Sequence, residues 1–327
     1  MGNRHAIVVG GELSPLAVRA AEDRGIALVV SKPYPSVEEL VALANDVGAE
    51  ALIVRMGKID RDVMEGIATL KIVVKHGVGF DTIDVRSAAE LGLPVLVAGG
   101  ANTQSVAEQA LALLMSVARS TAWLDRRLRE GEWDKSSYAG IEMTGRSIGL
   151  VGLGAIGRAF LHLLAPFGMT VRVYDPYLAP DQLPGGATLV GDLGVLLAQS
   201  DVVSLHCPLT EANRHLIDTA ALARMKPNAI LINTARGGLV DEAALIAALR
   251  DGTIRGAGLD TFAQEPPGRD NPLWSLPNLV ASPHVGANTE EARARVGVSC
   301  VEQVVDYLDR GILSARNHVN APSRLAA

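Results

Sequence analysis

The chain has 327 residues, of which 48% are hydrophobic and 20% charged, a balance typical of globular domains rather than of disordered segments. This length predicts two domains, at about 150 residues for each domain. The formal net charge is −6 and no run of lysine and arginine occurs, which argues against nucleic acid as a partner. Only Cys207 and Cys300 are present and they form no C-x-x-C pair, so neither a disulfide framework nor a thiolate metal site is expected.

The chain also lacks the apolar segments that membranes and export require. No apolar run approaches the roughly 18 residues of a membrane span, and the apolar stretch at residues 6–9 is too short for a signal peptide. We therefore expect a protein of the reducing cytoplasm, with no membrane partner.

Short runs rich in β-branched residues alternate with helical patterns over the first hundred residues. Ser36 followed by Glu39 is a capping box that predicts a helix over 37–47, and Asp84 can cap a helix that ends near Leu91 and Gly92. The alternation predicts a parallel sheet covered by helices. Buried strands are expected at 6–9, 27–30, 51–54, 72–74 and 95–97.

A long helix with a regular apolar face begins at Ser105 and is expected to connect two domains. A second alternating series follows, with strands expected at 147–151, 171–174, 202–205, 229–232 and 256–259. Asn288 followed by Glu291 predicts the start of a last long helix that ends at Gly311 and returns to the first domain. The predicted fold class is α/β, with two doubly wound parallel-sheet domains.

A glycine pattern follows the first strand of the second series. Gly152, Gly154 and Gly157 form G-x-G-x-x-G at the point where that strand leads into a helix. The first glycine permits a tight turn, the second allows close approach of a pyrophosphate, and the third allows the helix to pack on the strand. The first-turn N–H groups of the helix would then bind the phosphates.

An acidic residue stands where this pattern needs one. Asp175 ends the next strand, 18 residues after Gly157. A carboxylate there accepts hydrogen bonds from ribose hydroxyls and repels a 2′-phosphate, so NAD is favoured over NADP. The seven histidines are scattered and no H-E-x-x-H occurs, so no metal site is predicted.

Three polar residues follow predicted strands or occupy loops that could carry hydride-transfer chemistry. Reduction of a keto acid needs a cation for the carboxylate and carbonyl, and an acid that protonates the alkoxide. Arg236 follows a buried strand, Glu265 follows the next, and His284 lies between Pro283 and Gly286. Taken singly, each is also compatible with a purely structural role.

Three segments together resemble the signature regions of the D-isomer-specific 2-hydroxyacid dehydrogenase family, of the phosphoglycerate dehydrogenase-like kind. They are Asn233 to Gly238, Ala257 to Pro267, and Ser282 to Thr289. The resemblance extends to residues 75–81 and 102–108, and so covers nearly the whole chain.

The resemblance implies roles for individual residues. Arg236 would bind the substrate carboxylate and carbonyl, His284 would be the general acid and base, and Glu265 would orient His284. Asp260 would contact the nicotinamide amide. Other cofactor contacts are implied at Gly152, Gly154, Ala155, Ile156, Gly157, Asp175, Pro208 and Thr234, and other substrate contacts at Arg55, Val78 and Gly79.

The resemblance also implies an architecture. We expect a Rossmann NAD-binding domain over residues 102–287 and a flavodoxin-like substrate domain that is interrupted in sequence, over 1–101 and 288–327. Members of the family are usually homodimers, and a homodimer is expected here. Because the chain ends at Ala327, no additional regulatory domain is expected.

The substrate stays open among small 2-hydroxy and 2-keto acids. Arg55 and Lys58 could meet the phosphate of 3-phosphoglycerate or phosphohydroxypyruvate, whereas Val78 replaces a threonine typical of serine-pathway enzymes. Glyoxylate/hydroxypyruvate reduction is the alternative, and lactate-like or sulfolactate-like substrates remain open. A different class, an NAD(H)-sensing corepressor, uses the same fold in a few relatives.

Overall fold

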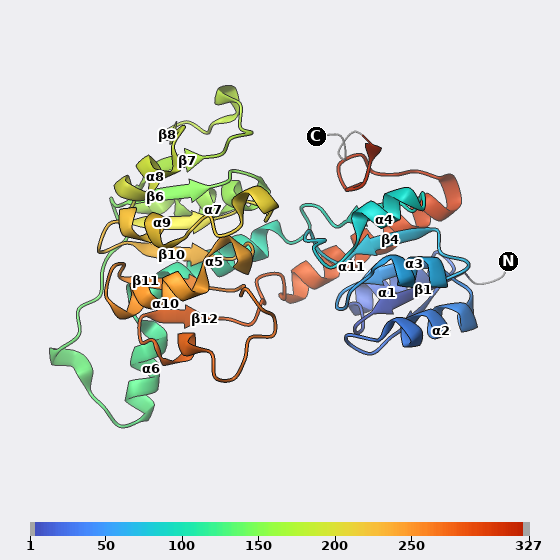
Figure 1. The fold of residues 1–327 in the computed structure, drawn as a ribbon, viewed down its shortest axis with the longest axis horizontal. Helices are drawn as coiled ribbons and strands as arrows, with labels where there is room; N and C mark the ends of the chain where they lie inside the picture. The colour runs from blue at the N-terminus through green and yellow to red at the C-terminus, as the bar shows by residue number, and fades with distance from the viewer. Residues whose placement is uncertain (1–3, 323–327) are drawn as a thin grey trace. The chain divides into compact units, whose positions relative to one another are not determined.

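The computed structural model describes residues 4–322, which form two compact units, each built on one parallel sheet with helices on its faces (Figure 1). One unit contains the chain up to Asn102 together with the chain from Ala287 onward, and the other runs from Thr103 to Gly286. The predicted α/β class with two parallel sheets is confirmed.

The first unit contains a five-stranded sheet in the order β2-β1-β3-β4-β5, in which every pairing is parallel. Its strands are β1 (Arg4–Val9), β2 (Ile26–Val30), β3 (Ala49–Val54), β4 (Ile72–Lys75) and β5 (Val95–Val97). Its helices are α1 (Pro15–Glu22), α2 (Val37–Val47), α3 (Arg61–Gly66), α4 (Val85–Glu90) and α11 (Glu290–Arg310). The central strands are rich in valine and isoleucine because helices cover both faces and no side of the strand meets water.

Helix ends in this unit follow the capping signals of the sequence, with one exception. The Ser36 and Glu39 capping box opens α2, and Asp84 accepts from the Ser87 N–H at the start of α4. Helix α11 ends at Gly311 with φ 66°, as predicted, but its N-cap is Thr289 rather than Asn288. The Thr289 hydroxyl accepts from the Ala292 N–H at 3.1 Å, which starts the helix one residue later than the capping-box pattern indicated.

The second unit contains a seven-stranded parallel sheet in the order β12-β11-β10-β9-β6-β7-β8. Its strands are β6 (Ser147–Val151), β7 (Thr170–Tyr174), β8 (Ala187–Leu189), β9 (Val202–Leu205), β10 (Ile230–Asn233), β11 (Gly256–Leu259) and β12 (Leu279–Ala281). Its helices are α5 (Thr103–Ala118), α6 (Thr121–Arg129), α7 (Ala155–Leu164), α8 (Leu193–Gln199), α9 (Thr219–Arg224) and α10 (Glu242–Arg250). The two edge strands, β8 and β12, were missed from the sequence because each has only three residues and none of these is buried, whereas the equally short β5 is buried throughout.

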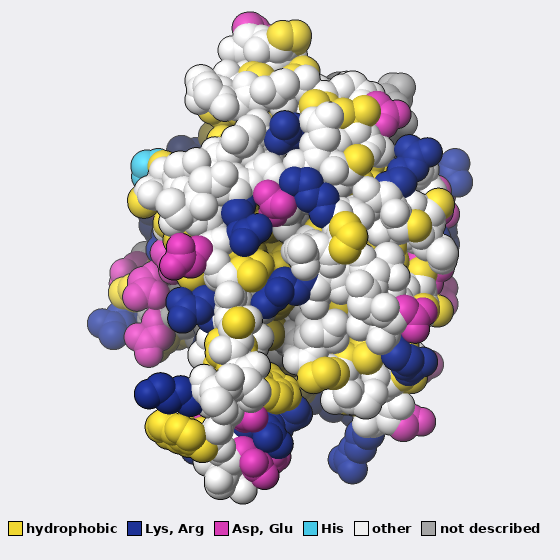
Figure 2. Space-filling model, turned by 90° about the vertical axis from the view of Figure 1, so that its left-hand side faces the viewer, with side chains coloured by type: hydrophobic (Ala, Val, Ile, Leu, Met, Phe, Trp, Pro, Cys, Tyr) yellow, Lys and Arg dark blue, Asp and Glu magenta, His cyan; other side chains and the backbone are white. Residues whose placement is uncertain are grey.

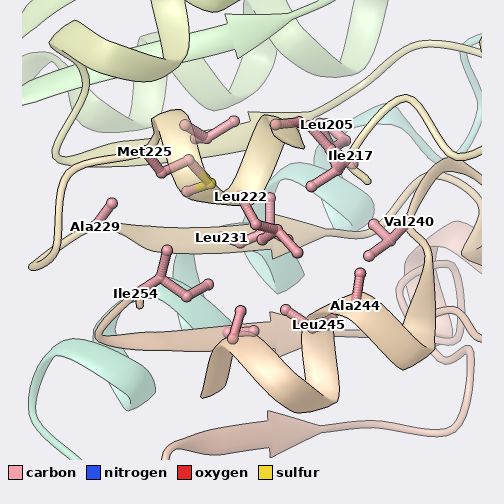
Figure 3. Packing of buried hydrophobic residues seen from close by; sticks show 14 of the residues in the cluster. Leu205, Ile217, Leu222, Met225, Ala229, Leu231, Val240, Ala244, Leu245 and Ile254 are labelled. Atoms are coloured by element: carbon pink, nitrogen blue, oxygen red, sulfur yellow. The ribbon is translucent and has the colours of Figure 1, made fainter. Parts of the chain in front are cut away.

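Apolar side chains fill both faces of this second sheet. Leu222 of α9 and Met225, which directly follows that helix, lie near Leu231 of β10, and Leu245 of α10 packs into the same cluster (Figure 3). The opposite face is covered by α5 and α7, which contact each other and bury Leu113, Leu114 and Phe160 among others. The two layers hold the central strands in register, so the loops that follow those strands start from fixed positions.

The surface carries mixed charge. On the face drawn in Figure 2, lysine and arginine side chains lie among aspartate and glutamate side chains. Within residues 4–322, no helix is both long enough and apolar enough to cross a membrane.

Candidate active site

The glycine-rich turn lies at the point where the strand order of the second sheet reverses. Strand β6 pairs with β7 on one side and with β9 on the other, so this is the point where ligands usually bind in open α/β sheets. Gly152, Gly154, Ala155, Ile156 and Gly157 belong to the β6–α7 turn. Pro208 lies three residues beyond the end of β9.

Only glycine fits the close contacts of this turn. Gly152 has φ 90°, and a Cβ there would lie 3.0 Å from the backbone of His206 and Cys207. A Cβ at Gly157 would lie 2.6 Å from the Gly152 oxygen. Gly154 is the N-cap of α7 and makes no side-chain cap, so the first N–H groups of this helix remain available for an anion.

His206, which the sequence analysis overlooked, lies next to the glycine turn, close to Gly152 and Gly157. Its ring contacts Phe160 at a centroid distance of 5.3 Å and shares a 2.9 Å hydrogen bond between Nε2 and the Ser204 hydroxyl. Burial lowers the pKa of His206 to about 4, so the ring next to the glycine turn is neutral at pH 7. In the sequence, His206 is followed by a cysteine and a proline after a buried strand, and this pattern indicates no role at the glycine turn.

Asp175 connects the end of β7 to the glycine turn. Its Oδ2 accepts from the Leu153 N–H at 2.9 Å and its Oδ1 accepts from the Tyr177 N–H at 3.0 Å. These bonds fix the carboxylate beside the turn, while the remaining lone pairs can accept from a ribose hydroxyl.

The turn after β10 presents Arg236. Asn233 shapes it, because its Oδ1 accepts from the Ala235 N–H at 3.0 Å and its Nδ2 donates to the Arg236 carbonyl at 2.8 Å. A Cβ at Gly237 would lie 1.9 Å from the Phe262 carbonyl carbon, so glycine is required for the two turns to meet. Thr234 is buried beside them, and its hydroxyl has no hydrogen-bond partner among the described residues.

Glu265 and His284 form a direct pair. His284 Nδ1 lies 2.6 Å from Glu265 Oε2, and Glu265 Oε1 accepts from the Phe262 N–H at 3.0 Å. The His284 side chain is 49% exposed, so Nε2 can reach a ligand while Nδ1 is held by the carboxylate.

The ionisation of Glu265 is set by competing effects. Burial alone would raise the pKa of Glu265, but hydrogen bonds from His284 and from the Phe262 N–H, and the charges of His284 and Arg236, outweigh it and lower that pKa. The carboxylate is therefore ionised at neutral pH and can stabilise a protonated His284 ring. Arginine, glutamate and histidine thus come together on one edge of the sheet.

Asp260, another predicted cofactor residue, is buried and bonded to the loop that carries His284. Its side chain is 1% exposed, and its oxygens accept from the Ser282 hydroxyl and from the N–H groups of Val285 and Gly286. The carboxylate thus holds the loop that carries His284, a contact that the sequence did not indicate.

The predicted substrate residues Arg55, Val78 and Gly79 belong to the first unit. Arg55 follows β3, and its Nη1 donates to the Glu12 carbonyl at 2.5 Å. Val78 and Gly79 lie in the loop after β4. No group of three or more histidine, cysteine, aspartate or glutamate side chains within residues 4–322 could hold a metal ion.

Comparison with known proteins relates the chain to a dehydrogenase family. Residues 111–286 match the family described as D-isomer specific 2-hydroxyacid dehydrogenase, NAD binding domain. A D-3-phosphoglycerate dehydrogenase from Methanocaldococcus jannaschii is 44% identical over 288 residues, which cover 88% of this chain and 54% of that protein. This chain therefore spans about half the length of that relative.

Two further proteins are similar over most of both chains. A hydroxypyruvate reductase from Thermotoga maritima is 41% identical, with 86% of this chain and 91% of that protein covered. The structure of an NADPH-dependent glyoxylate/hydroxypyruvate reductase from Sinorhizobium meliloti superimposes with a TM-score of 0.85 at 28% identity, covering 98% of this chain and 99% of that one. With the matched residues and the coverage of these relatives, the chain belongs to the D-isomer-specific 2-hydroxyacid dehydrogenase family, the NAD-binding oxidoreductases that act on the CH–OH group of 2-hydroxy acids.

Proposed function

We propose that the protein is an NAD-dependent dehydrogenase that reversibly interconverts a small 2-keto acid and the D-2-hydroxy acid. The observation that carries this proposal is the 2.6 Å contact between Glu265 and His284 on the sheet edge where Arg236 also lies. Reduction of a carbonyl requires an acid that protonates the carbonyl oxygen and a cation that binds and polarises the substrate, and His284 and Arg236 are groups of these two kinds.

The residues divide the chemistry as follows. Arg236 binds the substrate carboxylate through its planar fork and polarises the carbonyl. The glycine turn, Asp175, Pro208 and Thr234 would hold a nicotinamide dinucleotide, which would supply the hydride when bound. His284 donates the proton from Nε2 to the carbonyl oxygen as that oxygen becomes a hydroxyl, and Glu265 stabilises the protonated ring. In the reverse direction His284 takes the proton back.

Substitution of the pair tests this division of roles. We expect His284→Ala to lower kcat for keto-acid reduction about 1,000-fold and Glu265→Gln about 10- to 100-fold, with little change in NADH affinity. Steady-state rates and NADH fluorescence titration measure both quantities. Near-normal turnover of His284→Ala would contradict the assignment of the acid.

The residues of the first unit bear on which acid is the substrate. We propose that Arg55, Val78 and Gly79 bind substrate and that a phosphate-bearing acid, phosphohydroxypyruvate or 3-phosphoglycerate, is preferred. Positive charge supports this preference: burial, then the charges of Arg55, Lys75 and Arg293, lower the pKa of His76 to about 4. Hydroxypyruvate or glyoxylate is the alternative, supported by the hydroxypyruvate reductase that the chain matches over nearly its whole length.

A panel of acids distinguishes these substrates. Rates of NADH oxidation are measured with phosphohydroxypyruvate, hydroxypyruvate, glyoxylate and pyruvate. We expect Arg55→Gln to raise KM for phosphohydroxypyruvate about 10- to 100-fold, the loss expected when a charged hydrogen bond is removed, and to leave KM for glyoxylate unchanged. Arg295→Gln, on the exposed part of α11, is the matched control. Equal effects of Arg55→Gln on KM for phosphohydroxypyruvate and for glyoxylate would contradict phosphate recognition by Arg55. Tight NADH binding without any turnover would favour a nucleotide-sensing role.

NAD is proposed as the cofactor in preference to NADP. Support comes from the fixed Asp175 carboxylate, which a 2′-phosphate would have to approach. We expect kcat/KM to be at least about 100-fold higher with NADH than with NADPH, and Asp175→Ser to reduce this ratio about tenfold or more. Asp192→Ser, which makes the same substitution at the N-cap of α8 elsewhere in this unit, is the control.

A homodimer is also proposed. Its support is an exposed segment of the second unit, which consists of α6 and the residues that follow it up to Trp133. This helix buries none of its residues, and Leu128 and Trp133 are 58% and 74% exposed. In Figure 1 the segment projects from the sheet of its unit, and the lower end of Figure 2 carries hydrophobic side chains beside charged ones. Such a patch is typical of an interface.

Light scattering after size exclusion tests the dimer. We expect about twice the 34.3 kDa mass of one chain for the wild type, and a shift toward one chain for Leu128→Asp. Leu16→Asp, at another exposed leucine, is the control. A wild-type mass of one chain would contradict the proposal. We also propose that the protein works in the cytoplasm, where its two free cysteines stay reduced, and cell fractionation tests that location.

A further inference from the structure

The loop of residues 282–286 holds the histidine of the site in an unusual backbone conformation. His284 has φ 52°, a left-handed value that costs free energy for any residue with a Cβ. Within the loop, only the His284 N–H bond to the Ser282 carbonyl, at 3.0 Å, supports this conformation. The conformation must therefore be imposed by contacts from outside the loop.

Asp260 supplies the first of these contacts. Its Oδ1 accepts from the Val285 N–H at 2.9 Å and its Oδ2 accepts from the Gly286 N–H at 2.8 Å. The two amides directly after His284 are thus bound to one buried carboxylate, and a Cβ at Gly286 would lie 2.9 Å from Oδ2. Two hydrogen bonds to one rigid group fix the direction of the backbone as it leaves the histidine.

A second group of contacts continues from Asp260 to helix α5. The Ser282 hydroxyl donates to Asp260 Oδ1 at 2.6 Å and accepts from Gln109 Nε2 at 2.8 Å. A hydroxyl has one proton, so the glutamine amide orients that proton toward the carboxylate. Ser105, one turn earlier on α5, donates its hydroxyl to the Gly286 carbonyl.

We propose that Gln109, Ser282 and Asp260 are positioning residues for His284, because together they hold the 282–286 loop so that the imidazole stays against Glu265. This inference rests on the proposed role of His284 as the acid and base. The side chains of Gln109 and Ser282 bond neither the His284 ring nor Glu265, so they act through Asp260 and the loop backbone, where the Ser282 carbonyl accepts from the His284 N–H.

The position of Asp260 favours this role. With 1% exposure and three hydrogen bonds received inside the unit, most of its acceptor capacity is used by the loop. A contact with the nicotinamide amide would act on cofactor affinity, whereas a positioning role acts on the rate of proton transfer. The two roles therefore predict different kinetic effects.

Substitutions of Gln109 and Ser282 separate an effect on cofactor affinity from an effect on the rate of proton transfer. Gln109→Leu removes the bond to Ser282, Ser282→Ala removes the bonds to both Gln109 and Asp260, and Ser282→Thr keeps the hydroxyl. Gln104→Leu is the control because the Gln104 side chain donates to the exposed Glu108 on the same helix. Each variant is assayed with NADH and with hydroxypyruvate and phosphohydroxypyruvate as probes. We measure kcat, its pH profile, the NADH dissociation constant and the hydrogen exchange of the peptide that contains residues 282–286.

We expect Ser282→Ala to lower kcat about tenfold, because it removes a hydrogen bond to the charged Asp260. Gln109→Leu should lower kcat about 3- to 10-fold, because it removes a bond between neutral groups. The pH profile of kcat should change in the same two variants, the NADH dissociation constant should stay within about twofold, and Ser282→Thr should retain most of the rate. Hydrogen exchange in the 282–286 peptide should accelerate in Gln109→Leu and not in Gln104→Leu.

Unchanged kcat and exchange in both variants would overturn the inference, as would a loss of rate matched by an equal loss of NADH affinity. Should Gln109→Leu fail to fold, the comparison of Ser282→Ala with Ser282→Thr carries the test. Absence of turnover in the wild type would refute the proposed function instead, and the exchange measurement would still decide whether these residues hold the loop.

Discussion

Parallel pairing of the strands in the second sheet is the constraint on which the site depends. Each strand of a parallel sheet starts at the same edge, so the carboxyl ends of β6, β7, β9, β10 and β11 all reach the opposite edge. Gly152, Asp175, Arg236 and Glu265 are far apart in the chain, yet each follows one of these ends. The apolar layers on both faces keep the register, and with it the spacing of the turns.

Those parts of the fold that depend on repeated patterns could be predicted from the sequence. Strands buried on both faces are continuous apolar runs, which is why β9 and β11 were predicted with the bounds that they have. Strands β8 and β12 lie at the edges, where three partly exposed residues give no pattern. Helix α6 was missed for a related reason: since it buries none of its residues, its sequence needs no apolar face toward its own unit.

The site was predictable as a set of residue types and not as a set of contacts. Gly152 and Asp175 belong to a local pattern with fixed spacing, and Glu265 and His284 were expected to pair through the family resemblance. By contrast, Asp260 was expected at the cofactor, while its carboxylate is bonded to backbone groups 25 and 26 residues later. Hydrogen bonds between a side chain and a distant loop leave no periodicity in a sequence, so only the structure reveals them.

The bond from Ser105 to Gly286 has a consequence for how such a chain can be assembled. The second unit begins at Thr103 and ends at Gly286, and this bond brings its entry and its exit together. A unit whose two ends meet can be inserted into a surface connection of another unit without stretching it. In these terms the second unit is an insertion between β5 and α11, and an excised fragment of residues 103–286 would carry Arg236, Glu265, His284 and their supporting bonds complete.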